Sequence, residues 1–380
     1  MAHLLDYATL RVLWWLLLGV LLAGFAVMDG FDLGAAIWLP FLGRNDAERR
    51  IVINSFGPVW EGNQVWLILG GGAIFAAWPM VYAVAFSGFY LAMFLVLCTL
   101  ILRPVAIKYR SKHAAPRWRT LWDWALFVAG LVPALVFGVA VGNALLGVPF
   151  RFDGDLRMIY DGGLLGLFRP FAVLAGLVSV AMLAMHGGAF LASKAASPVT
   201  ERARLAAALS ALVVIVLFAL AGWWATRLDG YRIVGVLAHD GPSNPVGKQA
   251  VQAAGAWLDN YRALPWLRVV PGLGFAGAAL AALALALKWD KLAVFCSGLS
   301  VAGIVATAGV SMFPFILPSS LDPSMSLTVW DASSSRTTLV IMLVATLIFM
   351  PIILLYTAFV YRVLRGRVSA GQIEGETNSY

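Results

Sequence analysis

The sequence predicts an all-α polytopic membrane protein, and three observations indicate this fold class. Hydrophobic residues make up 61% of the 380 positions and charged residues only 12%, and the mean hydropathy is +0.86, far above that of a water-soluble domain. Apolar runs of roughly 20 residues or more recur along the chain, each long enough to cross the hydrocarbon layer. Lys and Arg gather in short segments between these runs, as topology signals do.

The net charge of +8 therefore reflects membrane orientation. Because no basic run with interleaved aromatic residues occurs, a nucleic-acid partner is not predicted. Membrane lipid is the expected surroundings of the chain.

Nine apolar runs predict nine transmembrane helices, near residues 12–42, 51–77, 80–102, 121–148, 164–191, 205–225, 264–287, 292–317 and 339–359. They form a single integral membrane domain over residues 1–365, followed by a polar cytoplasmic tail at 366–380 that we expect to end without structure. The first run is too long for the apolar region of a signal peptide, so we expect it to be a helix of the mature protein.

The second run is the weakest of the nine. It contains Pro58, Glu61, Asn63, Gln64 and the glycines at 70–72, so a hydropathy scan can omit it and leave eight spans. Nine spans with the amino terminus outside (periplasmic) and the carboxyl terminus in the cytoplasm place the basic clusters near 44–50, 103–119, 194–204, 288–291 and 362–367 on the inner side. We therefore favour nine. Pro58 removes a backbone hydrogen bond, so a kink is expected there.

The two longest loops, 149–163 and 227–261, fall outside in this topology and predict ordered turns. Ser333–Ser335 directly precede the last run, and we expect a helix cap there rather than a catalytic serine. The residues Gly272, Gly274 and Gly277 form a GxGxxG pattern. No strand precedes this pattern and the run is a membrane helix, so close helix packing is the expected role.

Four ionisable residues lie inside the apolar runs. Asp29 and Asp32 share one face of the first helix, and Asp32 is about 15 Å from its inner end. Glu61 falls at a similar depth on the second helix, and Arg103 closes the third helix on the same side. Charges at such depth persist only when they are paired, neutralised or open to water. We therefore predict a proton pathway through Glu61, Asp32, Asp29 and Arg103.

Two alternatives to a proton pathway stay open. The acids can instead hold helices together by hydrogen bonds, with Asn63 and Gln64 in the same role. A secondary transporter is the second alternative, since carboxylates near Gly and Pro interruptions also mark ion-coupled sites. No matched pair of broken helices is visible in the two halves of the chain, which disfavours the transporter.

Sites for cofactors and metals are weakly marked. Only His186 is deep enough to reach a haem or metal, and a lone helix histidine is more often packed or hydrogen-bonded. Trp60 is a second weak cofactor-binding candidate, although aromatic packing is its default role. Cys98 and Cys296 lack metal or disulfide spacing, and no metal site is predicted.

Several stretches resemble a known family. They are AVMDGFDLG, GRNDAERRIVINSFGPVWEGNQVWLILGGGAIFAAWPMVYA, LRPVAIKYRSK, WDWALFV, GVAVGNALLGVPF, MFPFILPSS and LTVWDASSS. Together they closely resemble subunit II of the cytochrome bd quinol oxidases. The resemblance covers nearly the whole chain, and the block from GRND to WPMVY is long enough to be specific.

The resemblance implies a fold of two four-helix bundles plus one peripheral helix. It implies a complex in the bacterial plasma (inner) membrane that oxidises quinol and reduces dioxygen to water in an electrogenic reaction. The partner is a haem-bearing subunit I, which ligates mainly or wholly two haems b and one haem d, and small single-helix accessory subunits can attach. Some family members hold a structural quinone in subunit II. The chain by itself is not expected to be catalytic.

The resemblance also implies residue roles. Asp32 is the second acid of DGFD and Glu61 the acid of W(D/E)GN, and both are expected on a cytoplasmic proton path with Arg103 of LRPV close by. This sequence has Glu rather than Asp in the second motif, which moves the carboxyl group by about one bond length. The alternative implied role is a purely structural scaffold for subunit I, without proton transfer.

Overall fold

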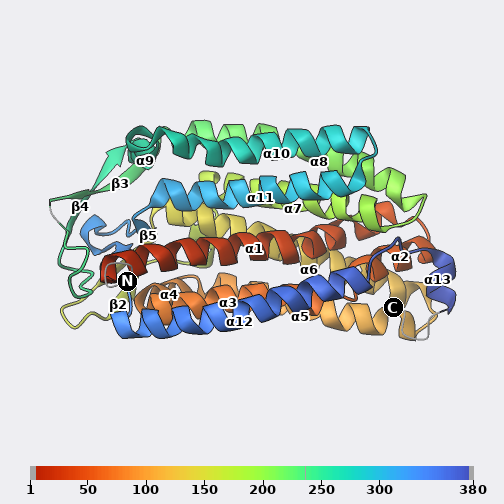
Figure 1. Ribbon diagram of the computed structural model, residues 1–380, viewed down its shortest axis with the longest axis horizontal. Coiled ribbons are helices and arrows are strands. Elements are labelled where there is room, and N and C mark those ends of the chain that lie inside the picture. Colours follow the sequence, from red (N-terminus) through yellow and green to blue (C-terminus); the bar gives the residue numbers. More distant parts are fainter. Residues whose placement is uncertain (1–5, 236, 376–380) are drawn as a thin grey trace.

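The computed structural model describes residues 6–235 and 237–375 and shows long helices running side by side (Figure 1). Within these residues, eight helices are long and apolar enough to cross a membrane. They are α1 (Tyr7–Leu42), α5 (Tyr90–Tyr109), α6 (Pro116–Leu146), α7 (Pro170–Lys194), α8 (Val199–Ala225), α10 (Val269–Ala286), α11 (Asp290–Met312) and α12 (Arg336–Val363). The predicted fold class, an all-α polytopic membrane protein, is confirmed.

A further helix, α3 (Trp60–Ala77), has 18 residues, and its polar and glycine residues lower its hydropathy below that of the eight candidate spans. Near its start, Asn63 contacts Tyr361 at the end of α12. At its end, the Ala77 carbonyl accepts a hydrogen bond from the Ser334 amide, just before α12 begins. Through these contacts α3 lies alongside α12, and the ninth crossing that the charge pattern favours stays a prediction.

The predicted second helix, 51–77, is wrong as a single element. Its first residues belong to a separate helix, α2 (Asp46–Phe56), whose Asn45 cap accepts a hydrogen bond from the Glu48 amide at 2.9 Å. The chain turns at residues 57–59 before α3 starts. The expected kink at Pro58 is thus a complete break.

Other boundaries also differ from those predicted. The expected helix at 80–102 is divided into α4 (Pro79–Gly88) and α5, and the run at 292–317 ends as a helix at Met312. The tail includes a short helix, α13 (Ala370–Gly375), whereas its expected unstructured end, 376–380, lies outside the described residues. Ser335 caps α12 by accepting from the Thr338 amide, which confirms the predicted serine cap.

Three antiparallel hairpins lie at the end of the molecule where α1 begins (Figure 1). They pair β1 (Phe150–Phe152) with β2 (Met158–Tyr160), β3 (Asp229–Val234) with β4 (Gln249–Ala254), and β5 (Phe315–Leu317) with β6 (Leu327–Thr328). Short helical turns complete the connections at η2 (Arg110–Lys112), η3 (Leu164–Leu167), η4 (Ala256–Leu258), α9 (Asp259–Ala263), η5 (Pro265–Arg268) and η6 (Pro323–Met325). Over the residues that the structure describes, both long loops are therefore ordered, as their composition predicted.

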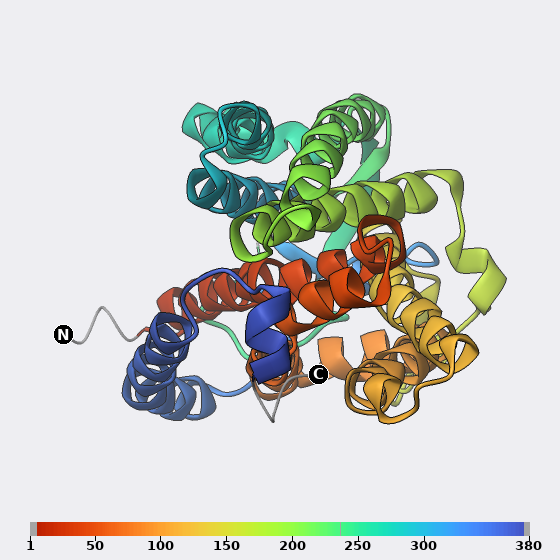
Figure 2. The same ribbon diagram turned by 90° about the vertical axis from the view of Figure 1, so that its right-hand side faces the viewer.

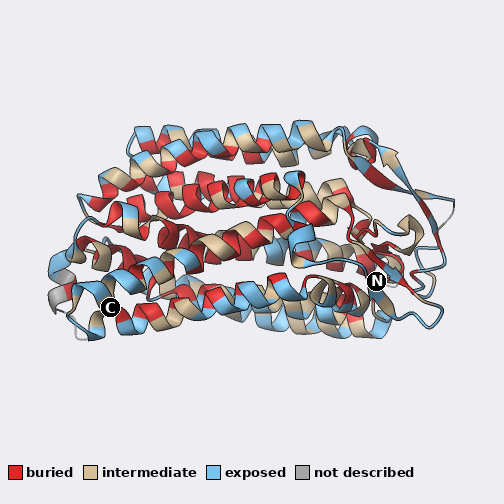
Figure 3. Ribbon diagram, turned by 180° about the vertical axis from the view of Figure 1, so that it is seen from behind, coloured by how far each residue is buried: buried red, intermediate tan, exposed pale blue. Residues whose placement is uncertain are grey.

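The long helices form two groups of four. One group contains α1, α3, α5 and α6, and the other contains α7, α8, α10 and α11. Helix α12 lies at the edge of the first group, where it packs against α1 and α3. Figure 3 shows the burial concentrated in the central helices. This arrangement agrees with the two bundles and one peripheral helix that the resemblance implied.

Glycines allow the closest helix contacts. A Cβ atom at Gly34 of α1 would lie 1.9 Å from the Leu183 carbonyl oxygen of α7, and one at Gly277 of α10 would lie 2.6 Å from the Ser300 amide nitrogen of α11. Neither distance is possible for real atoms, so both crossings require glycine. The contact at Gly277 confirms the packing role predicted for the GxGxxG pattern.

Candidate functional site

Three ionisable side chains form a fully buried cluster between α1 and α5. Asp29, Asp32 and Arg103 each have 0% exposure. Arg103 Nη1 donates to Asp29 Oδ1 at 2.8 Å. The spacing of the two acids on one helix turn places both carboxyl groups on one face of α1, which α3 packs against and which Arg103 reaches from α5. The structure thus brings together three of the four predicted pathway residues.

Asn63 connects this cluster to the peripheral helix. Its Nδ2 donates to Asp32 Oδ2 at 2.8 Å, and its Oδ1 accepts from the Tyr361 hydroxyl at 2.9 Å. One hydrogen-bonded chain therefore joins α12, α3 and α1. The sequence predicted Asn63 only as a helix-holding residue and did not mark Tyr361, because a tyrosine near the end of an apolar helix is ordinary at a membrane interface.

The chain of hydrogen bonds lies near one end of the membrane span. Tyr361 is two residues from the end of α12 at Val363, and the 28 residues of α12 are about 42 Å long, enough to cross hydrocarbon and head groups together. Helix α1 continues to Leu42, beyond the level where α12 stops. The acids are therefore closer to the membrane surface than their distance from Leu42 suggests.

Several polar atoms of the cluster have no hydrogen-bond partner within the described part of the chain. They are Asp29 Oδ2, Asp32 Oδ1, Arg103 Nε and Arg103 Nη2. Buried atoms of this kind are ordinarily satisfied by ordered water. Two carboxylates and one guanidinium together carry a charge of −1. The cluster is therefore electrically neutral when one of the two carboxyl groups is protonated. The arrangement can hold a proton and exchange it through water.

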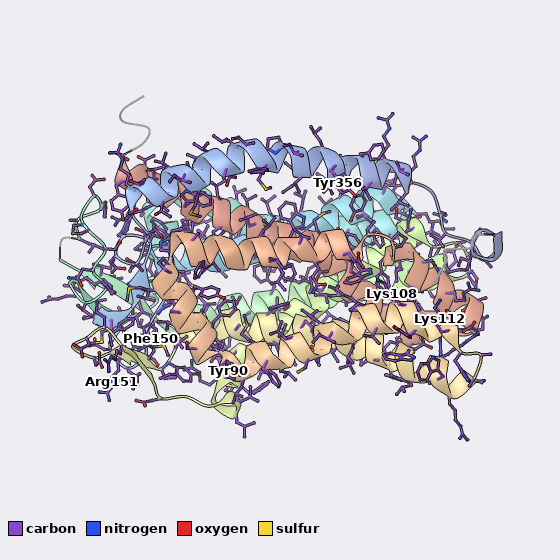
Figure 4. The ribbon with its side chains drawn as sticks, turned by 90° about the horizontal axis from the view of Figure 1, so that it is seen from below. Tyr90, Lys108, Lys112, Phe150, Arg151 and Tyr356 are labelled. Atoms are coloured by element: carbon purple, nitrogen blue, oxygen red, sulfur yellow. The ribbon has the colours of Figure 1, made fainter. Side chains whose placement is uncertain are left out.

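Glu61 does not join the cluster. Its side chain is 67% exposed and its Oε1 lies 3.6 Å from Nζ of Lys108 at the end of α5; Figure 4 labels Lys108. Two residues along a helix correspond to a rotation of about 200°, so Glu61 points outward when Asn63 points at Asp32. The sequence predicted Glu61 as the residue of this helix at the depth of Asp32, whereas the residue that contacts Asp32 in the structure is Asn63.

Trp60 is buried and lies against Arg103, whose Cζ is 5.4 Å from the ring centroid. A guanidinium over an indole face is a favourable cation–π contact. The geometry therefore gives Trp60 a role in holding Arg103 beside Asp29.

His186 is 1% exposed, with Nε2 3.0 Å from the Val27 carbonyl oxygen and Nδ1 2.8 Å from Ser297 Oγ. Both ring nitrogens are engaged, so this histidine does not fit the role of a haem ligand. Over residues 6–235 and 237–375, no group of three or more His, Cys, Asp and Glu residues is arranged to hold a metal ion.

A cavity of about 910 Å³ opens beside Tyr361. The ends of α7, α11 and α12 line it together with the α2–α3 junction, where Asn54, Ser55 and Pro58 contribute. Since Tyr361 belongs to both the cavity wall and the hydrogen-bonded chain, the cavity is the nearest opening to Asp32 along that chain.

Comparisons with known proteins agree on one family. The family model for cytochrome bd terminal oxidase subunit II matches residues 10–364. The chain is 50% identical over 377 residues to cytochrome bd-I ubiquinol oxidase subunit 2 of Escherichia coli K12, with 99% of this chain and all of that protein covered. It is 32% identical to cytochrome bd ubiquinol oxidase subunit 2 of Bacillus subtilis, covering 95% of this chain and 98% of the relative.

The fold is also that of a solved structure. A chain of the bd oxidase from Geobacillus thermodenitrificans aligns with a TM-score of 0.64, covering 93% of this chain and 98% of that one at 17% identity. At this identity the likeness supports the fold alone.

Proposed function

This chain belongs to the cytochrome bd terminal oxidase subunit II family, and on that premise we propose that it stabilises the haem-bearing subunit I of a quinol oxidase and conducts protons toward it. The complex oxidises quinol and reduces dioxygen to water in the bacterial inner membrane. The observation that carries the proton-conducting role is the buried Asp29–Asp32–Arg103 cluster, joined by Asn63 to Tyr361 at the cavity wall.

The proposed route runs from the cavity past Tyr361 to Asp32. An amide does not release a proton readily, so Asn63 is a positioning residue that orients the Asp32 carboxyl group and the Tyr361 hydroxyl. Water beside Asp32 Oδ1, which no described group contacts, would carry the proton over this step. Arg103 holds Asp29 in place, and its positive charge reduces the net negative charge of the cluster.

The basic residues support the cytoplasmic origin of these protons. The cavity lies at the end of the bundle that contains the arginines and lysines of α2, η2, the α7–α8 and α10–α11 turns, and the segment after α12. Positive charge of this kind remains on the cytoplasmic side of a membrane. The amino terminus is then periplasmic and the carboxyl terminus cytoplasmic.

Haem binding is assigned to subunit I. The one deep histidine of this chain, His186, has both ring nitrogens engaged, so we propose that the two haems b and the haem d have their ligands in the partner. When bound there, they transfer electrons from quinol to dioxygen. A structural quinone and small single-helix accessory subunits belong to the same proposal, as components of the assembled complex.

Glu61 has a separate place in this proposal. A carboxylate that is exposed on a membrane helix is unfavourable against lipid, and the Lys108 ammonium group at 3.6 Å offsets only part of its charge. We assign Glu61 to the surface that subunit I covers, where it would receive or deliver protons between the two chains.

The deciding variant is Asp32→Asn in the assembled complex. The amide keeps an oxygen for the Asn63 donor but cannot exchange a proton, so we expect quinol oxidase turnover to fall by a factor on the order of 100 with normal haem content. Asp259→Asn, in the loop before α10, is the matched control and should retain full turnover. If the Asp32→Asn complex assembles and turns over normally, the chain is a scaffold without a relay.

A further inference from the structure

The cavity beside Tyr361 has an unusual excess of positive charge. Five cationic side chains line it, from Lys194, Lys288, Lys291, Arg365 and Arg367, with one acid, Asp290. That acid is already occupied, since Arg204 and Arg367 each contact it at 2.8 Å. Lys288, Lys291 and Arg365 form no ion pair with any carboxylate whose side chain the structure describes.

Membrane topology alone does not explain this excess. Other arginines at the same end pair with acids: Arg49 and Arg110 contact Asp123, and Arg119 contacts Asp46. Some of the basic side chains at this end are thus paired with a carboxylate. Three that are not so paired, Lys288, Lys291 and Arg365, line one cavity. Figure 2 looks onto this end of the molecule, where the C-terminal segment (dark blue) extends over the helix ends.

The backbone at Lys288 supplies a second observation. Lys288 has a φ of +62°, the left-handed conformation that glycine adopts most easily at the end of a helix. The turn between α10 and α11 would therefore favour glycine. The turn therefore gives no reason for a lysine here, and Lys288 is one of the residues that line the cavity.

The cavity is also partly apolar. Phe190, Leu292 and Val363 contribute to its wall, and Trp289, which is 59% exposed, lies at its rim. Tryptophan is typical of the membrane interface. Since α7 and α12 end here and α11 begins here, the cavity lies at the level of the lipid head groups.

We infer that this cavity binds the phosphodiester head group of an anionic glycerophospholipid. The lysine and arginine side chains would contact the phosphate oxygens, and the acyl chains would follow the apolar wall into the membrane. A volume of about 910 Å³ is at the upper end of the range for small-molecule sites. Free phosphate has the same charge chemistry but does not account for the apolar wall.

The test uses the complete complex, purified, stripped of lipid in detergent and titrated with phosphatidylglycerol or phosphatidylcholine while bound lipid is counted by native mass spectrometry. The test variant is Lys288→Gly/Lys291→Ala, in which glycine suits the left-handed backbone. The control is Lys112→Ala/Arg117→Ala, which removes two exposed charges at the same end outside the cavity. We expect the test variant to weaken phosphatidylglycerol binding roughly twentyfold and the control to change it less than threefold.

Three results would overturn the inference. The first is equal phosphatidylglycerol affinity in the test variant and the unmodified complex. The second is phosphatidylcholine binding as tight as phosphatidylglycerol binding, since the site would then not select lipids by the charge of the head group. The third is complete displacement of phosphatidylglycerol by millimolar inorganic phosphate, which would identify a soluble anion as the ligand.

Discussion

At the scale of single residues, the hydroxyl of Tyr361 is the point where the cavity meets the buried chain of hydrogen bonds. Tyr361→Phe removes this hydroxyl and leaves Asn63 Oδ1 without its donor at 2.9 Å. Because a hydrogen bond contributes about 0.5–1.5 kcal/mol net, we expect turnover of the complex to fall about two- to tenfold. Steady-state quinol oxidation, normalised to haem content, measures the effect.

The same helix offers a control for this prediction. Tyr356 lies five residues earlier on α12 and is 68% exposed (Figure 4), so Tyr356→Phe should leave turnover unchanged. Equal losses in the two variants would show that tyrosine hydroxyls on α12 act only through general stability. The proton route past Tyr361 would then be excluded.

The sequence identified part of this site but not its connections. Asp29, Asp32 and Arg103 stand out because charge inside an apolar run is costly. Which acid pairs with Arg103, and which residue of the second helix meets Asp32, depends on helix rotation. The break at residues 57–59 sets that rotation for α3, and a turn of this kind has no hydropathy signal. Tyr361 is far away in the chain, so only the fold brings it to Asn63.

At the scale of elements, a carboxylate of α2, that of Glu48, fixes this helix to the bundle by accepting hydrogen bonds from Arg202 and from the Arg44 amide. The hydrogen bond from Arg202 at 2.9 Å and the one from the Arg44 amide at 2.8 Å lower the pKa of Glu48 below its ordinary value of 4.5. A lowered pKa in the folded state stabilises the protein at pH values above 4.5, and this stabilisation is lost as the pH falls through the folded-state pKa.

Glu48→Gln should therefore lower the thermal stability of the complex at neutral pH, and the difference from the unmodified complex should shrink below pH 4.5. The midpoint of thermal inactivation in detergent, followed from neutral to acidic pH, measures this. Glu201→Gln is the control, because that carboxylate is 58% exposed in its pair with Arg204 and should matter little. A stability difference that does not vary with pH would contradict the role given to the Glu48 charge.

The crossing of α1 and α7 depends on a glycine. Gly34→Ala would place Cβ 1.9 Å from the Leu183 carbonyl oxygen, so the two helices would have to separate, at a cost of about 1–3 kcal/mol. Gly19→Ala on the same helix meets no atom within 4 Å and should be neutral or slightly stabilising. Thermal inactivation of the two variants compares them directly, and equal stabilities would contradict the tight crossing.

The elements themselves were largely predictable, with one systematic error. Hydropathy and charge identified every long crossing because lipid imposes length and apolarity on each. The division of 51–77 into α2 and α3 was missed because residues 51–56 are mostly apolar and pack inside the protein, so their composition resembles that of a membrane span. Burial against other helices and burial in lipid leave the same signal in a sequence.

At the scale of the whole molecule, two broad faces expose apolar side chains, and charge distinguishes them. The face formed by α8 and α10 carries only apolar side chains over its central part, such as Leu212, Val216 and Leu280, as lipid requires. The face formed by α3 and α5 exposes Ile68 and Leu97 but also the Glu61–Lys108 pair. Glu61 is in the first turn of α3 and Lys108 in the last turn of α5, and polar groups at the edge of an exposed apolar surface are typical of a protein interface. We therefore expect the haem-bearing subunit to cover the α3–α5 face.

Site-specific photo-crosslinking tests this assignment in intact membranes. A photoreactive phenylalanine analogue at Ile68 on α3, which is 70% exposed, should form an adduct with the haem-bearing subunit. The same group at Val216 on α8, which is 64% exposed, is the matched control and should react with lipid. Adducts with the haem-bearing subunit from position 216 and not from position 68 would reverse the assignment, and Glu61 would then face lipid instead of a partner. Because proton transfer between the chains requires contact at Glu61, that result would also remove Glu61 from the proposed proton route and restrict the route to Tyr361, Asn63 and Asp32.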